Sequence, residues 1–192
     1  MANAYPSTGR PVRRRRSRTL EPEAGRRLVE VWRTSARATE LLVGKLPKEI
    51  WTLPIPGAPR RTVRAIAAHL HNARGMWLKM LGGGTKGHGV AIPRSVDARR
   101  VTREELLRAL GKSTEAIAEL MEVGIARGGE MPRAAWQNFP PDLEHFTAYF
   151  VAHEAHHRGQ LLLVARQLGH RLPPEVTGGI WGWRKLGRDN SG

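Results

Sequence analysis

Three histidines fall within five residues of the segment 151–161, which is part of a long stretch with helical apolar periodicity. A helical wheel started at Phe146 aligns one stripe of side chains at spacings of three and four residues. Its further members are Phe150, His153, His157, Gln160, Leu161, Val164 and Leu168. His153 and His157 therefore lie one turn apart on the predicted core face, whereas His156 points away from it. Two imidazoles at this spacing can bind the same divalent ion.

The alternative is that His153 and His157 are two ordinary core histidines. A single buried imidazole is usually satisfied by a carbonyl or a hydroxyl group. Two imidazoles on one apolar face are harder to accommodate, because each buried polar ring destabilises the fold unless it has a partner. The pair therefore favours a metal site.

The composition limits what such a site can contain. The chain has 192 residues, enough for one domain with extensions and a sizeable core. Cysteine is absent, which excludes disulfides, a thiol nucleophile and thiolate ligands, so histidine and carboxylate must hold any metal. We expect no membrane span, since no window approaches 18 uninterrupted apolar residues. The basic N-terminus is not followed by an apolar segment, so a secretory signal is not expected and a cytoplasmic location is.

The formal net charge of +15 raises the question of nucleic-acid binding. Six arginines lie within residues 10–18, in a segment that contains Pro, Ser and Thr and has no apolar periodicity. We interpret residues 1–20 as a disordered basic tail. This tail could bind phosphates or be a solvated arm. Aromatic residues are not interleaved with it, so nucleic-acid binding through residues 10–18 is an alternative and not the main prediction.

Four long amphipathic helices are predicted from the apolar periodicity. They span residues 21–46, 62–81, 102–126 and from about 140 to near 169. Thr102 and Glu105 form a capping box at the start of the third helix. Pro141 is expected in the first turn of the fourth helix, where a missing N–H costs little.

The connections and ends complete the predicted fold. Residues 54–59 are expected to form a proline-rich loop, and residues 82–101 a glycine-rich linker in which His88 is exposed to solvent. Trp181 and Trp183 are expected to pack on the bundle. No alternation typical of strands occurs, so the predicted class is all-α, a four-helix bundle. The expected organisation is a basic tail (1–20), the bundle (21–186) and a flexible C-terminus (187–192).

The second predicted helix carries two histidines that could complete a metal site. His69 and His71 lie on opposite sides of its apolar stripe, and His71 is slightly closer to the apolar face. Metal sites in helical bundles are built from inward-facing side chains of neighbouring helices. The wheel alone leaves both histidines open and mildly favours His71.

Two motifs carry a resemblance to a known family. They are Ala67-Ala68-His69-Leu70-His71-Asn72 and His153-x-x-x-His157-Arg158-Gly159-Gln160. Over roughly residues 25–183 the chain resembles the DinB/YfiT-like family of four-helix-bundle metalloenzymes. The resemblance implies that His153 and His157 are metal ligands. It implies that the third ligand is His69, from the His-Leu pair, and we follow it, with His71 as the alternative.

The resemblance also implies a function. Three protein ligands around one divalent ion, with zinc or nickel expected, leave a coordination position open, as in catalytic sites. Such an ion could lower the pKa of bound water or bind a thiol as thiolate. We expect a thiol-dependent transferase acting with a low-molecular-weight thiol, or a hydrolase. Trp32, Trp77 and Phe150 are candidate walls of a substrate pocket. Relatives often pair through helices, so a homodimer is also expected.

The sequence also allows two other functions. Residues 153–157 satisfy H-E-x-x-H, the zinc-peptidase motif, in which Glu154 would be the general base. This motif is short and lacks a recognisable third ligand downstream, although Glu154 could still carry protons near an ion. The other alternative is a non-catalytic, stress-related protein that binds metal or nucleic acid, with the arginine-rich tail as its binding element.

Overall fold

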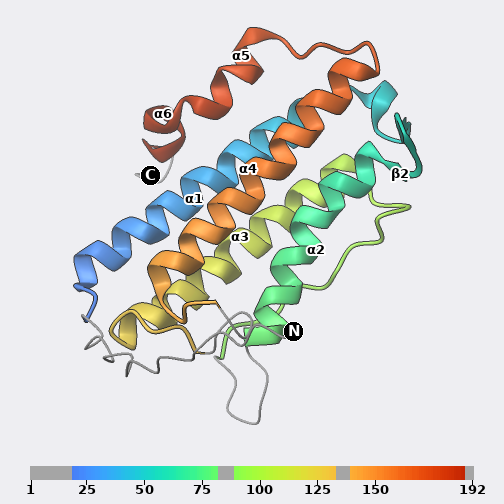
Figure 1. Cartoon of the computed structure of the whole chain (residues 1–192). Coiled ribbons are helices and arrows are strands. Elements are labelled where there is room, and N and C mark those ends of the chain that lie inside the picture. The colour runs from blue at the N-terminus through green and yellow to red at the C-terminus, as the bar shows by residue number, and fades with distance from the viewer. Residues whose placement is uncertain (1–18, 82–88, 133–138, 189–192) are drawn as a thin grey trace, which may run out of the picture.

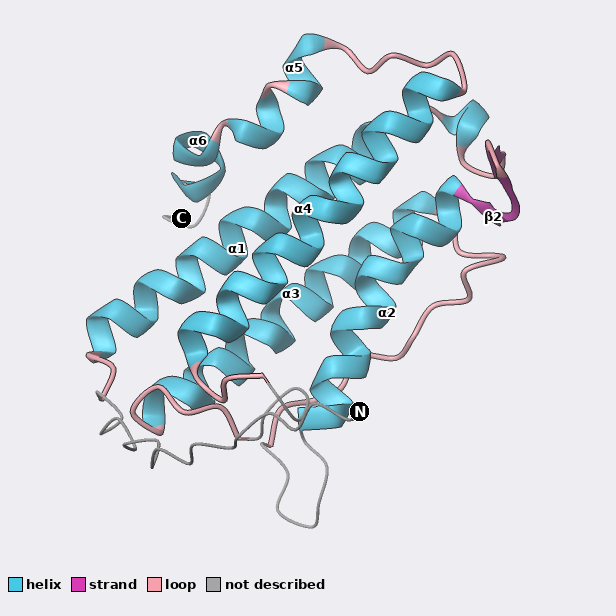
Figure 2. Ribbon diagram, viewed as in Figure 1, coloured by secondary structure: helices cyan, strands magenta, loops and turns pink. Residues whose placement is uncertain are grey.

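The computed structural model describes residues 19–81, 89–132 and 139–188. Within these ranges the chain is helical except for one small hairpin and the connecting loops (Figures 1 and 2). The α-helices are α1 (Pro22–Lys45), α2 (Val63–Leu81), α3 (Arg103–Ala126), α4 (Leu143–Gln167), α5 (Pro174–Thr177) and α6 (Trp183–Arg188). Two 3-10 helices, η1 (Lys48–Ile50) and η2 (Gly179–Trp181), and the strands β1 (Pro54–Ile55) and β2 (Ala58–Thr62) complete the elements. The predicted all-α fold is confirmed, and α1 to α4 are its four long helices.

Local capping signals explain where the long helices begin. Pro22 occupies the first turn of α1, where its missing N–H is not needed. At the start of α3 the Glu105 N–H donates to Thr102 Oγ1 over 3.1 Å, and the Thr102 N–H donates back to the Glu105 carboxylate over 2.8 Å. The start of α4 differs from the prediction. Asp142 caps it, accepting from the His145 N–H over 2.9 Å, so Pro141 precedes the cap and does not enter the first turn.

The core consists of two apolar clusters separated by a polar layer. α1 and α2 each pack against both α3 and α4. One cluster includes Leu42, Ile66, Leu110 and Leu161, and the other includes Trp32, Trp77, Ile117 and Phe150. On each long helix, most of the buried polar residues fall between the two apolar sets. The polar layer consists of Ser35, Thr39, His71, Arg74, Ser113, Thr114, Glu154, His157 and Arg158.

A buried ion pair is the centre of this layer. Arg74 donates from Nε and Nη2 to the two carboxylate oxygens of Glu154 over 3.0 and 2.9 Å. The side chains are 1% and 0% exposed. Arg74 Nη1 also donates to Ser113 Oγ, and Thr39 Oγ1 donates to Glu154 over 2.6 Å. Because these residues come from α1, α2, α3 and α4, one network joins all four long helices.

Several connections depart from the prediction. The proline-rich loop contains the antiparallel pair β1–β2, where Gly57 adopts a φ of +76° that permits the tight turn. α5, η2 and α6 fold back along α1 (Figure 1). There Trp183 packs against the core, but Trp181 is 74% exposed, so the expectation that both tryptophans pack was wrong. α6 continues to Arg188, two residues into the segment 187–192 expected to be flexible.

Other predictions fall outside the described residues. They concern the arginine-rich residues 10–18, residues 82–88 of the glycine-rich linker, which include His88, and the role of residues 189–192. The described part of the linker is fastened to α2, where Asn72 exchanges two hydrogen bonds with the backbone of Val96. Among the described helices, none is both long enough and apolar enough to cross a membrane.

Removal of one partner of the buried pair should destabilise the bundle strongly. We expect Arg74→Met to lower the free energy of unfolding by about 3–5 kcal/mol, because it leaves the Glu154 carboxylate buried without a counter-ion. Arg33→Met is the control, since Arg33 and Glu115 form a surface pair with side chains 33% and 57% exposed. Its loss should cost at most about 1 kcal/mol. Urea unfolding measures both, and equal losses would contradict the assigned role of the layer.

Candidate metal centre

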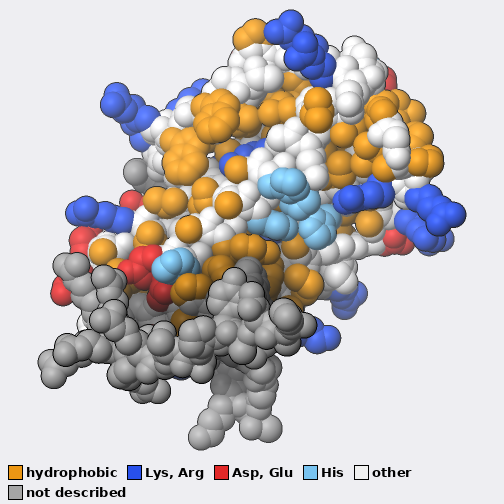
Figure 3. Space-filling model, viewed as in Figure 1, with side chains coloured by type: hydrophobic (Ala, Val, Ile, Leu, Met, Phe, Trp, Pro, Cys, Tyr) orange, Lys and Arg blue, Asp and Glu red, His pale blue; other side chains and the backbone are white. Residues whose placement is uncertain are grey.

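The structure brings His69, His153 and His157 together. α2 contributes His69 and α4 contributes the other two, and one ring nitrogen of each lies within 4.8 Å of those of the others. The ring of His69 is centred 5.4 Å from that of His153 and 4.7 Å from that of His157. Figure 3 shows histidine side chains gathered on one face of the molecule. The trio is thus the one implied by the family resemblance.

The centre lies at the edge of the core. His157 is buried, His153 is half-buried and His69 is exposed, so the space between them is open to solvent. This differs from the wheel, which placed both α4 histidines on the core stripe. The buried face of α4 includes the charged residues Glu154 and Arg158. They can be buried because each has a buried polar partner.

His71, the alternative third ligand, lies outside the cluster and forms hydrogen bonds in the core. It is 1% exposed, and its Nε2 donates to the backbone carbonyl of Arg94 over 2.9 Å while its Nδ1 lies 3.1 Å from Ser113 Oγ. Both ring nitrogens are therefore occupied, on the side of α2 that faces α3 and residues 89–101. The mild preference of the wheel for His71 was wrong, and this residue is an ordinary core histidine.

Gln160 orients one of the candidate ligands. His157 Nδ1 lies 2.8 Å from Gln160 Oε1. An amide oxygen only accepts, so Nδ1 carries the proton and the neutral ring keeps its lone pair on Nε2. Gln160 Nε2 in turn lies 2.9 Å from Nε2 of the exposed His156. Contacts of this kind fix the tautomer and orientation of metal-binding histidines. Arg158 has a packing role and donates to Ser35 and Thr39 of α1.

The electrostatics keep the three imidazoles neutral. Burial, together with the neighbouring His157, lowers the pKa of His153 to about 4. His69 is exposed on one side only, and its partial desolvation, together with the Arg61 guanidinium, lowers its pKa. Burial also lowers the pKa of His157, opposed by its hydrogen bond to Gln160. All three rings are therefore in the form that binds metal, because a protonated imidazole has no free lone pair.

The donor set fits a divalent ion. Nitrogens bound to zinc at 2.0–2.1 Å in a tetrahedral site lie about 3.3 Å apart. The observed separations of up to 4.8 Å need only modest side-chain rotations to reach that value. Imidazole suits zinc, nickel, copper and iron. Three ligands from the protein leave at least one position for water or substrate.

Glu154 does not have the place that the H-E-x-x-H motif assigns to it. Its side chain is 0% exposed, and both carboxylate oxygens are engaged by Arg74, with Thr39 bound to one of them. A carboxylate held in this way has no oxygen directed to a water or a proton donor at the histidine cluster. Glu154 is therefore a structural residue, and the zinc-peptidase interpretation loses its general base.

The aromatic surroundings also differ from the prediction. Trp32 and Phe150 are 0% and 1% exposed and belong to the core, not to the wall of a pocket. Tyr149 lies beside the centre instead, with its ring stacked on His153 at a centroid distance of 5.8 Å. Trp77 packs edge-on against Tyr149 over 5.3 Å. Sequence reasoning missed Tyr149, although its position four residues before His153 places it on the same helix face.

These features define a helical bundle with a candidate three-histidine metal centre between two of its long helices. The model of the DinB family matches residues 17–179, most of the chain, and the protein belongs to this family. No curated protein and no solved structure gives a significant match.

The lowered histidine pKa values predict how metal-free protein responds to acid. His153 titrates near 4 in the folded state and near 6.5 when unfolded, so the unfolded chain binds protons first as the pH falls. Stability should be lost progressively below pH 6.5 until the folded pKa is reached. In the presence of a chelator, we expect the urea midpoint of wild type to fall between pH 7 and pH 5, and that of His153→Gln to fall less. An identical decline in both proteins would be evidence against this electrostatic account.

Proposed function

We propose that this protein is a metal-dependent enzyme whose single divalent ion, zinc or nickel, is held by His69, His153 and His157. The observation that carries the proposal is the convergence of three neutral imidazoles at a place open to solvent. Membership of the DinB family supports it. A divalent ion bound there would supply Lewis acidity, which lowers the pKa of a coordinated water or thiol.

The residues around the centre support thiol chemistry over hydrolysis. Attack by water is assisted by a positioned base, and the expected base, Glu154, is held in the core by Arg74. A thiol has an ordinary pKa of about 8.5, so it loses its proton near neutral pH with little assistance. The open side at His69 gives solvent access for that proton. We therefore propose a transferase that uses a low-molecular-weight thiol, with hydrolysis as the second candidate.

The other residues of the site have positioning roles in this proposal. Gln160 holds the proton of His157 on Nδ1 and so presents Nε2. Tyr149 limits the rotation of the His153 ring by stacking on it. The exposed Met76 and Met80 lie seven and eleven residues after His69, on the same face of α2, and offer apolar contacts to a substrate.

Cobalt substitution tests the proposed use of a thiol. Protein loaded with Co²⁺ should develop a thiolate-to-metal charge-transfer absorption when 2-mercaptoethanol is added, and ethanol should produce none. His69→Ala should abolish the band. His145→Ala is the matched control, since His145 is an exposed histidine of α4 outside the cluster, and it should keep the band.

Binding of Co²⁺ without any band from the thiol would overturn the transferase proposal and leave the hydrolase candidate. A band of equal strength in His69→Ala would instead show that the ion lies elsewhere.

A further inference from the structure

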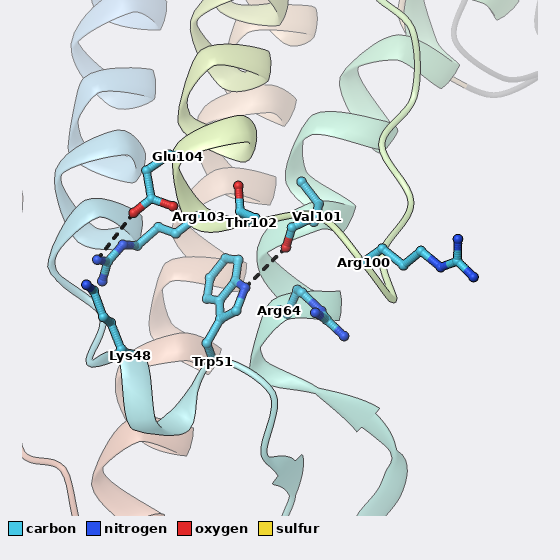
Figure 4. Close-up of a pocket in the computed structure, with 8 residues that line it drawn as sticks. All are labelled: Lys48, Trp51, Arg64, Arg100, Val101, Thr102, Arg103 and Glu104. Carbon is cyan, nitrogen blue, oxygen red and sulfur yellow. Dashed lines mark hydrogen bonds and ion pairs between the residues drawn. The ribbon is translucent and has the colours of Figure 1, made fainter.

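A cavity lies at the end of the bundle where α2 and α3 begin, and none of the three histidines lines it. Its volume is about 230 Å³, below the 300–1,000 Å³ of typical drug-sized ligand pockets, so it suits a small molecule. Its walls come from η1, the start of α2 and residues 100–104 (Figure 4). The charged and aromatic residues of its lining are Lys48, Trp51, Arg64, Arg100, Arg103 and Glu104.

The charge of this lining is strongly positive. Four of the lining side chains are cationic and one, Glu104, is anionic. Arg103 donates to the Leu46 carbonyl over 2.6 Å and lies 3.6 Å from Glu104, so it is already neutralised. Arg100 is 90% exposed and extends away from the other side chains in Figure 4. Within the described ranges, Lys48 and Arg64 have no carboxylate partner, which leaves positive charge for a ligand.

Arg64 has an unsatisfied donor at this cavity. Its Nε is buried and has no hydrogen-bond partner among the described residues. A buried polar group without a partner costs stability, and such groups are few in folded proteins. An oxyanion in the cavity would be attracted to this guanidinium group, because guanidinium groups bind carboxylate and phosphate oxygens through charge-assisted hydrogen bonds.

The position of Arg64 in its helix also favours a bound anion. It is the second residue of α2, where the helix macrodipole disfavours a cation. α1 and α4 carry Glu23 and Glu144 in their first turns, but α2 has no acidic residue there. The arginine therefore does not serve the stability of its own helix. An anion bound beside it would be favourable to both the guanidinium and the helix end.

Trp51 gives the cavity an apolar wall. Its indole Nε1 donates to the Val101 carbonyl over 3.2 Å, which fixes the ring between the two sides of the cavity. In Figure 4 Lys48 and Arg64 lie on opposite sides of this ring. The half-buried indole can contact the apolar part of a ligand whose charged group meets Arg64.

From these observations we propose that this cavity binds a small organic oxyanion, a carboxylate or a phosphate ester, with an apolar or aromatic part. Arg64 binds the oxyanion, Lys48 attracts it electrostatically, and Trp51 contacts the apolar part of the ligand. The site is separate from the histidine cluster, so it goes beyond the proposed reaction and serves a ligand other than the metal-bound thiol.

Titration calorimetry at constant ionic strength, with phenyl phosphate and benzoate as probes, tests this site. Inorganic phosphate reports the contribution of the charge alone, and benzylamine, an aromatic cation, is the negative control. We expect phenyl phosphate or benzoate to bind wild type more tightly than inorganic phosphate, and benzylamine not to bind. Arg64→Gln should weaken binding at least about tenfold, since a charge-assisted contact is lost.

Arg99→Gln is the matched control, because it removes the same charge from an exposed residue of the neighbouring loop. It should bind like wild type. Thermal unfolding checks that Arg64→Gln folds, and its midpoint should not fall, given the unfavourable place of the arginine in α2. Equal weakening in both variants would indicate non-specific attraction and overturn the proposal. So would unchanged binding in Arg64→Gln, or no binding of either oxyanion to wild type.

Discussion

The ion pair between Arg74 and Glu154 determines how the rest of the bundle is arranged. It connects α2 to α4 across the centre of the molecule, and its hydrogen bonds to Thr39 and Ser113 extend it to α1 and α3. Buried pairs of this kind are weak contributors to net stability, since the desolvation of two charges offsets their attraction. Their effect is on specificity, because only one rotation and one axial position of each helix satisfies all the donors and acceptors.

The location of the metal centre follows from this constraint. Successive residues of an α-helix are turned by about 100°, so with Glu154 directed into the core, His153 lies about 100° and His157 about 60° away on the same side. That side faces α2, where His69 lies five residues before Arg74. The ion pair between Arg74 and Glu154 therefore orients α2 and α4 so that their histidines face one another at the edge of the core. It also leaves Glu154 unable to serve as a base at the centre, which shapes the chemistry that the site can support.

The fold was largely predictable because its signals are local. The capping box at Thr102 and Glu105 and the proline at the start of α1 are visible within a few residues of sequence. The β1–β2 hairpin was missed because its strands are short and rich in proline. The polar layer was missed for a different reason: charged residues are buried only when paired, and the partner of Glu154 lies 80 positions away.

The candidate site was predictable in part. The spacing of His153 and His157 indicated a shared ion, and the family resemblance indicated His69. The wheel preferred His71 because it ranks residues by their closeness to the apolar face. That preference failed because His71 is satisfied in the core by Ser113 and Arg94, while a ligand on α2 must reach the outer edge. No local pattern distinguishes these two environments.

The most direct test of the central claim is the metal content of tag-free protein after reconstitution with zinc or nickel. Wild type and His145→Ala should each hold close to one ion per chain. His69→Ala and His157→Ala should each lose it, since either change removes one of the three ligands. A wild type that holds no ion, or a His157→Ala variant that retains a full complement, would contradict the three-histidine centre.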